Sequence, residues 1–297
     1  MNLPVGVQGA LNGLIPLALD SSGPSAPFTH DRALAALSMA AAVAGAYAAL
    51  ELSARAQARE GRVGLAWMAA AGLMLGAGVW AMHFIALVGL QTPLLRGISA
   101  GPTVASCIIA LVCASTGFLI GGRGRNLWRL AIAGLWFGVG SVLMHYVGMR
   151  GLVIDADLTY RPLFVAGTGL GAFACSTVGL WLCASPHPAW ARFGLAFPIG
   201  AAVASLHFFD IAGTVLAPRP SFAPPVPADV GAAIFTALAI GLAALAAWLL
   251  AWWDARREPA PALRPQRAAG MTKQAAGAEP NEGVVVVPDS SERASSR

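Results

Sequence analysis

The sequence predicts an all-α, polytopic membrane protein with seven transmembrane helices, arranged as three tandem helix-pair repeats and a closing helix. Of its 297 residues, 57% are hydrophobic and only 11% are charged, and the mean hydropathy is +0.67. A soluble domain carries about 25% charged residues, so these charges cannot cover the surface of a soluble protein of this size. Seven apolar segments each reach the roughly 20 residues that cross a bilayer, and histidines recur at a fixed spacing inside them.

The same composition excludes several function classes. The net charge of +5 comes from scarce acidic residues, and no basic face is dense enough to follow a phosphate backbone, so nucleic acid is not an expected partner. The lipid bilayer is the partner that the composition favours.

The predicted helices lie near 33–52, 64–90, 102–120, 128–150, 163–183, 192–216 and 229–253. Their apolar runs are continuous rather than alternating, which fits helices and not the strands of a barrel. The first six segments form repeats over about 33–90, 102–150 and 163–216, and the whole membrane domain spans 33–253.

The two ends of the chain lie outside this domain. Residues 1–32 hold no basic residue before Arg32 and are expected to form an extracytoplasmic arm. Residues 254–297 are rich in Pro, Ala and Ser and are expected to form a disordered tail, too short for an enzymatic output domain. Fourteen of the 19 basic residues fall on the side of this tail, which predicts an outside N-terminus and a cytoplasmic C-terminus.

An internal repeat links the second helix of each pair. His83, His145 and His207 are spaced by 62 residues. Small residues precede each of them by seven and eleven positions, on the same face of the helix as the histidine. These six predicted helix-packing residues are Gly72, Gly76, Gly134, Gly138, Ala196 and Gly200. Small residues at this spacing let helix backbones approach closely, so the histidine face is predicted to contact other helices rather than lipid.

The three histidines are expected to converge. Their helices run in the same direction, so the imidazoles lie at one depth, near the outer membrane face. An ionisable side chain at this depth is costly without a partner and indicates a functional site. The alternative is that each histidine bonds to a helix backbone and holds the bundle together.

The neighbouring residues indicate a metal site. Imidazole suits copper, zinc, iron and nickel, and a thioether selects Cu(I). Met82 and Met144 precede their histidines, whereas Met149 follows His145 by four residues on the same helix face and is therefore the best-placed thioether. Packing is the alternative role for these methionines. Asp210 follows His207 by three residues and is expected to orient an imidazole or bind the metal, unless it is a solvated acid near the helix end. His30 lies outside the repeat and is expected to be solvated.

These motifs resemble those of a known family. Met82-His83-Phe84-Ile85 and Met144-His145-Tyr146-Val147-Gly148-Met149 resemble the MHYT domain, a bacterial integral-membrane sensor module named for a Met-His-Tyr-Thr motif. Leu206-His207-Phe208-Phe209 resembles a degenerate third copy, in which Leu206 replaces the methionine. No copy has the motif threonine. The resemblance covers about residues 30–217.

The resemblance implies a function and a location. It implies that copper is bound by His83, His145, His207, Met82, Met144 and Met149, and that a diatomic gas (oxygen, carbon monoxide or nitric oxide) or the redox state is sensed. It also implies a multi-pass protein of the bacterial inner membrane. Because no output domain is expected, the chain resembles a stand-alone member whose signal passes to a separate cytoplasmic protein or through the tail.

Two other functions remain open from the sequence. Two histidines on facing helices are also typical of haem ligation, and a copper transporter or assembly factor would use similar ligands. An enzyme is not expected, since there is no Ser/His/acid set, phosphate-binding loop or pair of carboxylates in the membrane core.

Overall fold

The computed structural model describes residues 15–17 and 25–219, and over these ranges the chain forms six long helices and six short strands. The helices are α2 (Arg32–Gln57), α3 (Gly61–Val88), α4 (Ala100–Gly121), α5 (Leu127–Met149), α6 (Pro162–Cys183) and α7 (Ala189–Ala212). The strands are β1 (Thr29–His30), β2 (Leu90–Gln91), β3 (Leu95–Ile98), β4 (Leu152–Ile154), β5 (Ala156–Tyr160) and β6 (Thr214–Pro218).

All six helices are long and apolar enough to cross a membrane, so the chain is a multi-pass membrane protein. The shortest have 22 residues, which at 1.5 Å per residue is about 33 Å, close to the thickness of the hydrocarbon core. They occupy the first six predicted segments. The predicted seventh helix at 229–253, the predicted tail and most of the predicted N-terminal arm lie outside the described residues.

Local chemistry fixes several helix ends. The Asp31 carboxylate accepts a hydrogen bond from the Leu34 N–H at 2.9 Å and starts α2. The Asn126 side chain starts α5 in the same way. After α4, Gly122 has a φ of 68°, a conformation that favours glycine. There the Arg129 guanidinium donates to the Ile120 carbonyl at 2.9 Å, which satisfies an acceptor in the last turn.

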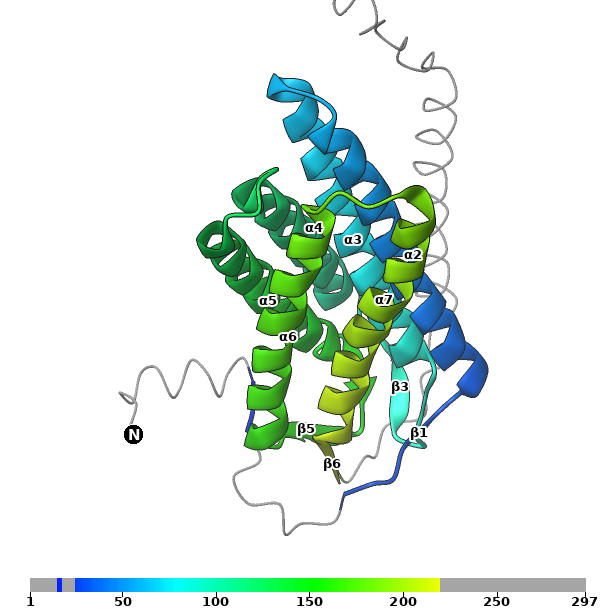
Figure 1. Cartoon of the computed structure of the whole chain (residues 1–297). Coiled ribbons are helices and arrows are strands. Elements are labelled where there is room, and N and C mark those ends of the chain that lie inside the picture. Colours follow the sequence, from blue (N-terminus) through cyan, green and yellow to red (C-terminus); the bar gives the residue numbers. More distant parts are fainter. Residues whose placement is uncertain (1–14, 18–24, 220–297) are drawn as a thin grey trace, which may run out of the picture. The chain divides into compact units, whose positions relative to one another are not determined.

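The six helices form a closed ring. Each helix packs on the next one along the chain, and α7 packs on α2 (Figure 1). Helix α3 also contacts α5 and α7, and 83% of its most apolar stretch is buried, against 50% or less in the other helices. Helices α6 and α7 share the smallest interface between neighbours in the ring.

Small residues make three equivalent helix crossings. A Cβ on Gly76 of α3 would lie 2.6 Å from the Ala110 carbonyl oxygen of α4, and Gly72 meets α4 one turn away. Gly138 and Gly134 of α5 meet α6 in the same way, and Gly200 of α7 meets α2. Ala196 is fully buried one turn before Gly200. The contact of α7 with α2 therefore repeats those of α3 with α4 and α5 with α6.

Three antiparallel strand pairs gather at one end of the helices, and we call them the strand collar (Figure 1). Strand β1 pairs with β2, β3 with β4, and β5 with β6. Each pair is anchored by one backbone hydrogen bond from the residue before a helix to a glycine after another helix. These bonds join Asp31 to Gly89 (2.8 Å), Ser99 to Gly151 (2.7 Å) and Arg161 to Gly213 (3.0 Å).

The collar was not predicted, and it changes the ends of two predicted helices. The segments predicted at 64–90 and 192–216 end at Val88 and Ala212, and the chain continues into β2 and β6. Backbone N–H and C=O groups beyond the helices need partners near the membrane, and the strand pairs supply them.

Candidate metal centre

The three repeat histidines meet inside the helix ring. His83 of α3, His145 of α5 and His207 of α7 each bring one ring nitrogen within 4.8 Å of those of the other two. The Nδ1 atom of His207 lies 3.1 Å from Nδ1 of His83 and 3.4 Å from Nδ1 of His145. The ring centroids are 4.8 to 5.3 Å apart, with edge-to-face geometry.

The three histidines are almost completely buried, so each ring nitrogen needs a polar partner. The residues His83, His145 and His207 are only 1%, 6% and 4% exposed. Among the residues that the structure describes, the Nε2 atoms of all three histidines are buried without a hydrogen bond. That of His145 has an ion-pair contact with Asp210, whereas those of His83 and His207 have no polar partner. An unpaired buried polar group costs about 1–3 kcal/mol. Backbone hydrogen bonds from the imidazoles, the alternative role considered for these residues, do not account for these two nitrogens.

Asp210 holds one of the three imidazoles. Its Oδ2 atom lies 2.7 Å from Nε2 of His145. Its other oxygen accepts hydrogen bonds from the Tyr146 hydroxyl at 2.6 Å and the Thr168 hydroxyl at 3.0 Å. The carboxylate is 1% exposed, so it is not the solvated acid considered from the sequence. A proton on His145 Nε2, beside the Asp210 carboxylate, would leave the Nδ1 lone pair facing the other imidazoles.

His83 fits against the backbone of α5. A Cβ added to Gly148 would lie 2.4 Å from Nε2 of His83. Only glycine therefore lets this ring reach its position beside His145 and His207. Gly148 belongs to the second sequence motif, but the sequence did not mark it as part of the site.

The methionines divide into two groups. Met82 and Met144 are each 2% exposed and line the same cavity as the three histidines. Met149 is equally buried but lines a separate pocket beside the collar, with Arg150 and Tyr160. The sequence favoured Met149 as the best-placed thioether, whereas in the structure Met82 and Met144, and not Met149, line the cavity of the histidines.

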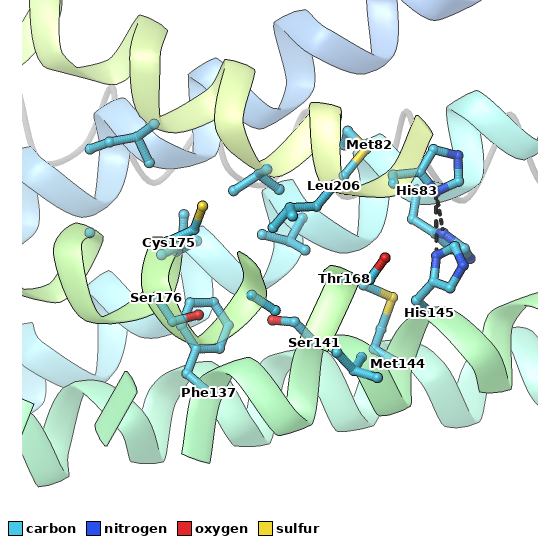
Figure 2. A pocket seen from close by; sticks show the side chains of 18 residues that line it. Met82, His83, Phe137, Ser141, Met144, His145, Thr168, Cys175, Ser176 and Leu206 are labelled. Atoms are coloured by element: carbon cyan, nitrogen blue, oxygen red, sulfur yellow. Dashed lines mark hydrogen bonds between the residues drawn. The ribbon is translucent and has the colours of Figure 1, made fainter. Parts of the chain in front are cut away.

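The cavity lies among α3, α5, α6 and α7 and has a volume of about 70 Å³. Figure 2 shows His83, His145, Met82, Met144 and Thr168 toward one end, and Cys175, Ser176 and Phe137 toward the other. All of its lining residues belong to helices, and most of the lining is apolar.

Two features of the surroundings were missed by sequence reasoning. Tyr146 stacks edge-on against Tyr160 of β5, with ring centroids 4.8 Å apart. Burial, and then the nearby Asp210 carboxylate, raise the pKa of Tyr160. His30 was expected to be solvated, but its Nε2 is buried and its ring lies 5.2 Å from that of Phe208. The adjacency of Tyr146 and Phe208 to the repeat histidines was the only signal in the sequence.

The histidine cluster fits a metal ion. Imidazole nitrogens bind ions such as zinc at about 2.0–2.1 Å, which places nitrogens around one ion about 3.3–3.6 Å apart. The two Nδ1 separations of 3.1 and 3.4 Å are close to that range. Met82 and Met144 add soft thioethers nearby, which is the ligand chemistry that favours Cu(I).

Comparison with known proteins identifies the repeat. The model of the MHYT family, described as a bacterial signalling protein N-terminal repeat, matches residues 76–134 and 138–196. The two matches begin 62 residues apart, which is the histidine period. No solved structure matches the chain significantly.

Relatives of the chain are signalling proteins. The bifunctional diguanylate cyclase/cyclic di-GMP phosphodiesterase MucR of Pseudomonas aeruginosa is 28% identical over 62% of this chain and 28% of its own length. An uncharacterised signalling protein of Caulobacter vibrioides is 27% identical over 66% of this chain and 24% of its own length. The cyclic di-GMP phosphodiesterase NbdA of P. aeruginosa is 26% identical over 63% and 25%. The matched part of the chain thus corresponds to about a quarter of each relative, and residues 76–134 and 138–196 match the MHYT repeat.

Proposed function

We propose that this chain is a membrane signalling module in which His83, His145 and His207 bind copper and respond to a diatomic gas or to redox state. The observation that carries the proposal is the buried meeting of the three imidazoles, with ring nitrogens within 4.8 Å of one another. The signalling role is supported by relatives that are named as a cyclic di-GMP enzyme and as a signalling protein.

The chain's own residues would prepare the site. Asp210 would fix the His145 tautomer, Gly148 would admit His83, and Met82 and Met144 would supply thioethers. Copper held there would supply a coordination position for a small ligand. Met149 remains a predicted ligand of the family pattern, although it lines the pocket beside the collar.

The geometry does not favour haem. The three imidazole rings contact one another edge to face, and a porphyrin between any two of them would have to separate the rings. A copper transporter would need polar groups along a path through the bilayer, but the cavity below the histidines is mostly apolar.

The proposed function also implies a membrane, an orientation and a partner that receives the signal. We place the protein in the bacterial inner membrane, with the N-terminus and the strand collar outside and the C-terminus in the cytoplasm. We retain a seventh helix at 229–253 and a disordered tail from 254. A separate cytoplasmic protein would receive the signal. Reporter fusions after residues 124 and 297 would test the topology, since both positions are expected to be cytoplasmic.

Metal analysis tests the proposed function. Full-length protein is purified in detergent, and its metals are measured by mass spectrometry beside a variant with His83→Ala, His145→Ala and His207→Ala. We expect copper near one per chain in the wild type and its loss in the variant. A His187→Ala variant is a matched control outside the cluster. Iron in place of copper, or no metal after reconstitution, would overturn the copper assignment.

A further inference from the structure

We propose that the cavity among α3, α5, α6 and α7 is a binding chamber for small, uncharged, apolar molecules that reach the three histidines from the hydrocarbon core of the bilayer. The chamber rests on the shape and chemistry of the cavity. Its role in delivering a ligand to the histidines rests in addition on the proposed function.

The position of the cavity sets the direction of approach. Leu75 lies eight residues before His83, and Gly179 lies eleven residues after Thr168, and all four residues line the cavity. At 1.5 Å per residue, the cavity therefore runs about 12–16 Å along the helices, away from the collar and toward the middle of the membrane. No residue of a described collar strand lines it.

The wall of the cavity is thin on one side. Helix α6 contributes Ala172, Ser176 and Gly179 to the lining. On its other face, Leu170 and Val178 are 72% and 54% exposed. Helices α6 and α7 share the smallest interface in the ring. The cavity is partly open rather than enclosed, and this weakly packed side is where a guest dissolved in the lipid would enter.

The lining and the size set the class of guest. The imidazole nitrogens lie at one end, and the rest of the lining offers few polar atoms, such as the Ser141 and Ser176 hydroxyls. An anion or a hydrated ion would therefore lose its water there without gaining enough partners. An apolar cavity of about 150 Å³ binds benzene or xenon and stays dry. The volume of about 70 Å³ is less than half of that and suits one xenon atom or one or two diatomic molecules.

Gly179 shows that the space is unfilled. It is a buried glycine, and an added Cβ would meet no atom within 4 Å among the described residues. A larger side chain at this position would fill the chamber without a clash at Cβ. Gly169, on the same helix, also has open space at its Cβ but does not line the cavity. The two positions give a matched pair of substitutions.

Xenon is a probe that needs no metal. Crystals of the full-length protein are pressurised with xenon, and anomalous density is measured for the wild type, Gly179→Leu and Gly169→Leu. We expect a xenon peak in the cavity of the wild type and of Gly169→Leu, and its loss in Gly179→Leu. If the wild type shows no xenon peak, or if an acyl chain occupies the cavity, the cavity is not a binding chamber for small molecules.

A second measurement tests the binding chamber and the copper assignment independently. In copper-loaded protein, the rate of carbon monoxide binding should fall in Gly179→Leu and stay unchanged in Gly169→Leu. If the wild type binds xenon but no copper, the chamber stands and the proposed function fails. If it binds copper but no xenon, or if Gly179→Leu binds carbon monoxide as fast as wild type, the chamber is wrong and the copper assignment survives.

Discussion

At the scale of single residues, the asymmetry of the histidine cluster comes from one position of the repeat. The residue three places after each histidine is Ala86, Gly148 or Asp210. Nε2 of His83 faces Gly148, whereas Nε2 of His145 faces Asp210. Each of these two imidazoles therefore contacts the residue that lies three places after the histidine of the next repeat. The third copy has a carboxylate at this position, whereas the second has a glycine, which leaves room for the ring.

Replacing the carboxylate tests its role in orienting His145. Asp210→Asn keeps the size of the side chain but removes the negative charge that lies 2.7 Å from His145 Nε2. Loss of such a partner typically lowers metal affinity by about 10–100-fold. Copper affinity is measured by competition with a chelator. Asp157→Asn, which breaks an exposed ion pair with Arg219, is the control and should leave the affinity unchanged. Equal affinity in Asp210→Asn and wild type would show that Asp210 does not position the ligand.

Gly148→Ala tests the contact between α5 and His83. The new Cβ would lie 2.4 Å from Nε2, so His83 must leave its place or the helices must separate. Overpacking of this kind costs about 1–3 kcal/mol, and we expect a lower Tm and weaker metal binding. Gly101→Ala, where a Cβ meets no described residue within 4 Å, is the control. A variant with wild-type Tm and metal content would contradict the tight contact.

The sequence predicted the histidines of the site and Asp210 as a partner of an imidazole, but not which imidazole Asp210 meets. Helical periodicity and the 62-residue spacing place His83, His145 and His207 on equivalent faces. The partnership of His145 with Asp210 depends on which repeats are neighbours in space, and periodicity carries no such information. The same limit explains why Met149 was favoured: it shares a face with His145 on one helix, but that helix presents it to the collar pocket.

At the scale of elements, the helices were predictable and the strands were not. A bilayer requires about 20 continuous apolar residues, so each helix leaves a long signal in the sequence. The strands have only two to five residues, and each pairs with a strand from a different part of the chain. Too few residues alternate to reveal a pattern, and the pairing depends on the helices being in place.

His30 in strand β1 should make the free energy of unfolding depend on pH. Burial lowers the pKa of His30 below its ordinary value of about 6.5. Below that pH the unfolded chain therefore takes up a proton that the folded chain resists, so the free energy of unfolding falls as the pH falls. We expect Tm to drop between pH 7.5 and 5.5, and to drop less in His30→Phe, which keeps an aromatic ring beside Phe28 and Phe208. An equal drop in both proteins would remove His30 as a cause.

At the scale of the whole molecule, the ring joins the repeats into one unit. The period in the sequence indicates three copies, but it cannot say whether the third copy returns to the first. The structure shows that it does, because Gly200 of α7 meets Val43 of α2. Large apolar side chains remain exposed on the ring, including Trp128, Leu163 and Trp190, as expected of a surface that contacts lipid.

A split chain tests this closure. Gly124 lies in the turn between α4 and α5, and a Cβ there would meet none of the residues that the structure describes within 4 Å. Cutting the gene after this codon yields one fragment with His83 and one with His145 and His207. Because both the α4–α5 and the α7–α2 contacts join the fragments, we expect them to purify together from one tag and to bind metal only as a pair. Separate purification would show that the interfaces do not hold the ring.

The equivalence of the three crossings has a further consequence for how such a site can evolve. A trimer of separate, identical helix pairs would build the same ring, but every change would then occur three times. An aspartate beside each imidazole would bury three negative charges around one centre, which is far more costly than burying one. Fusion of the three pairs into a single polypeptide allows one copy to carry the carboxylate while another keeps a glycine. In this molecule, the covalent link between the repeats is what permits a threefold framework to hold a centre without threefold symmetry.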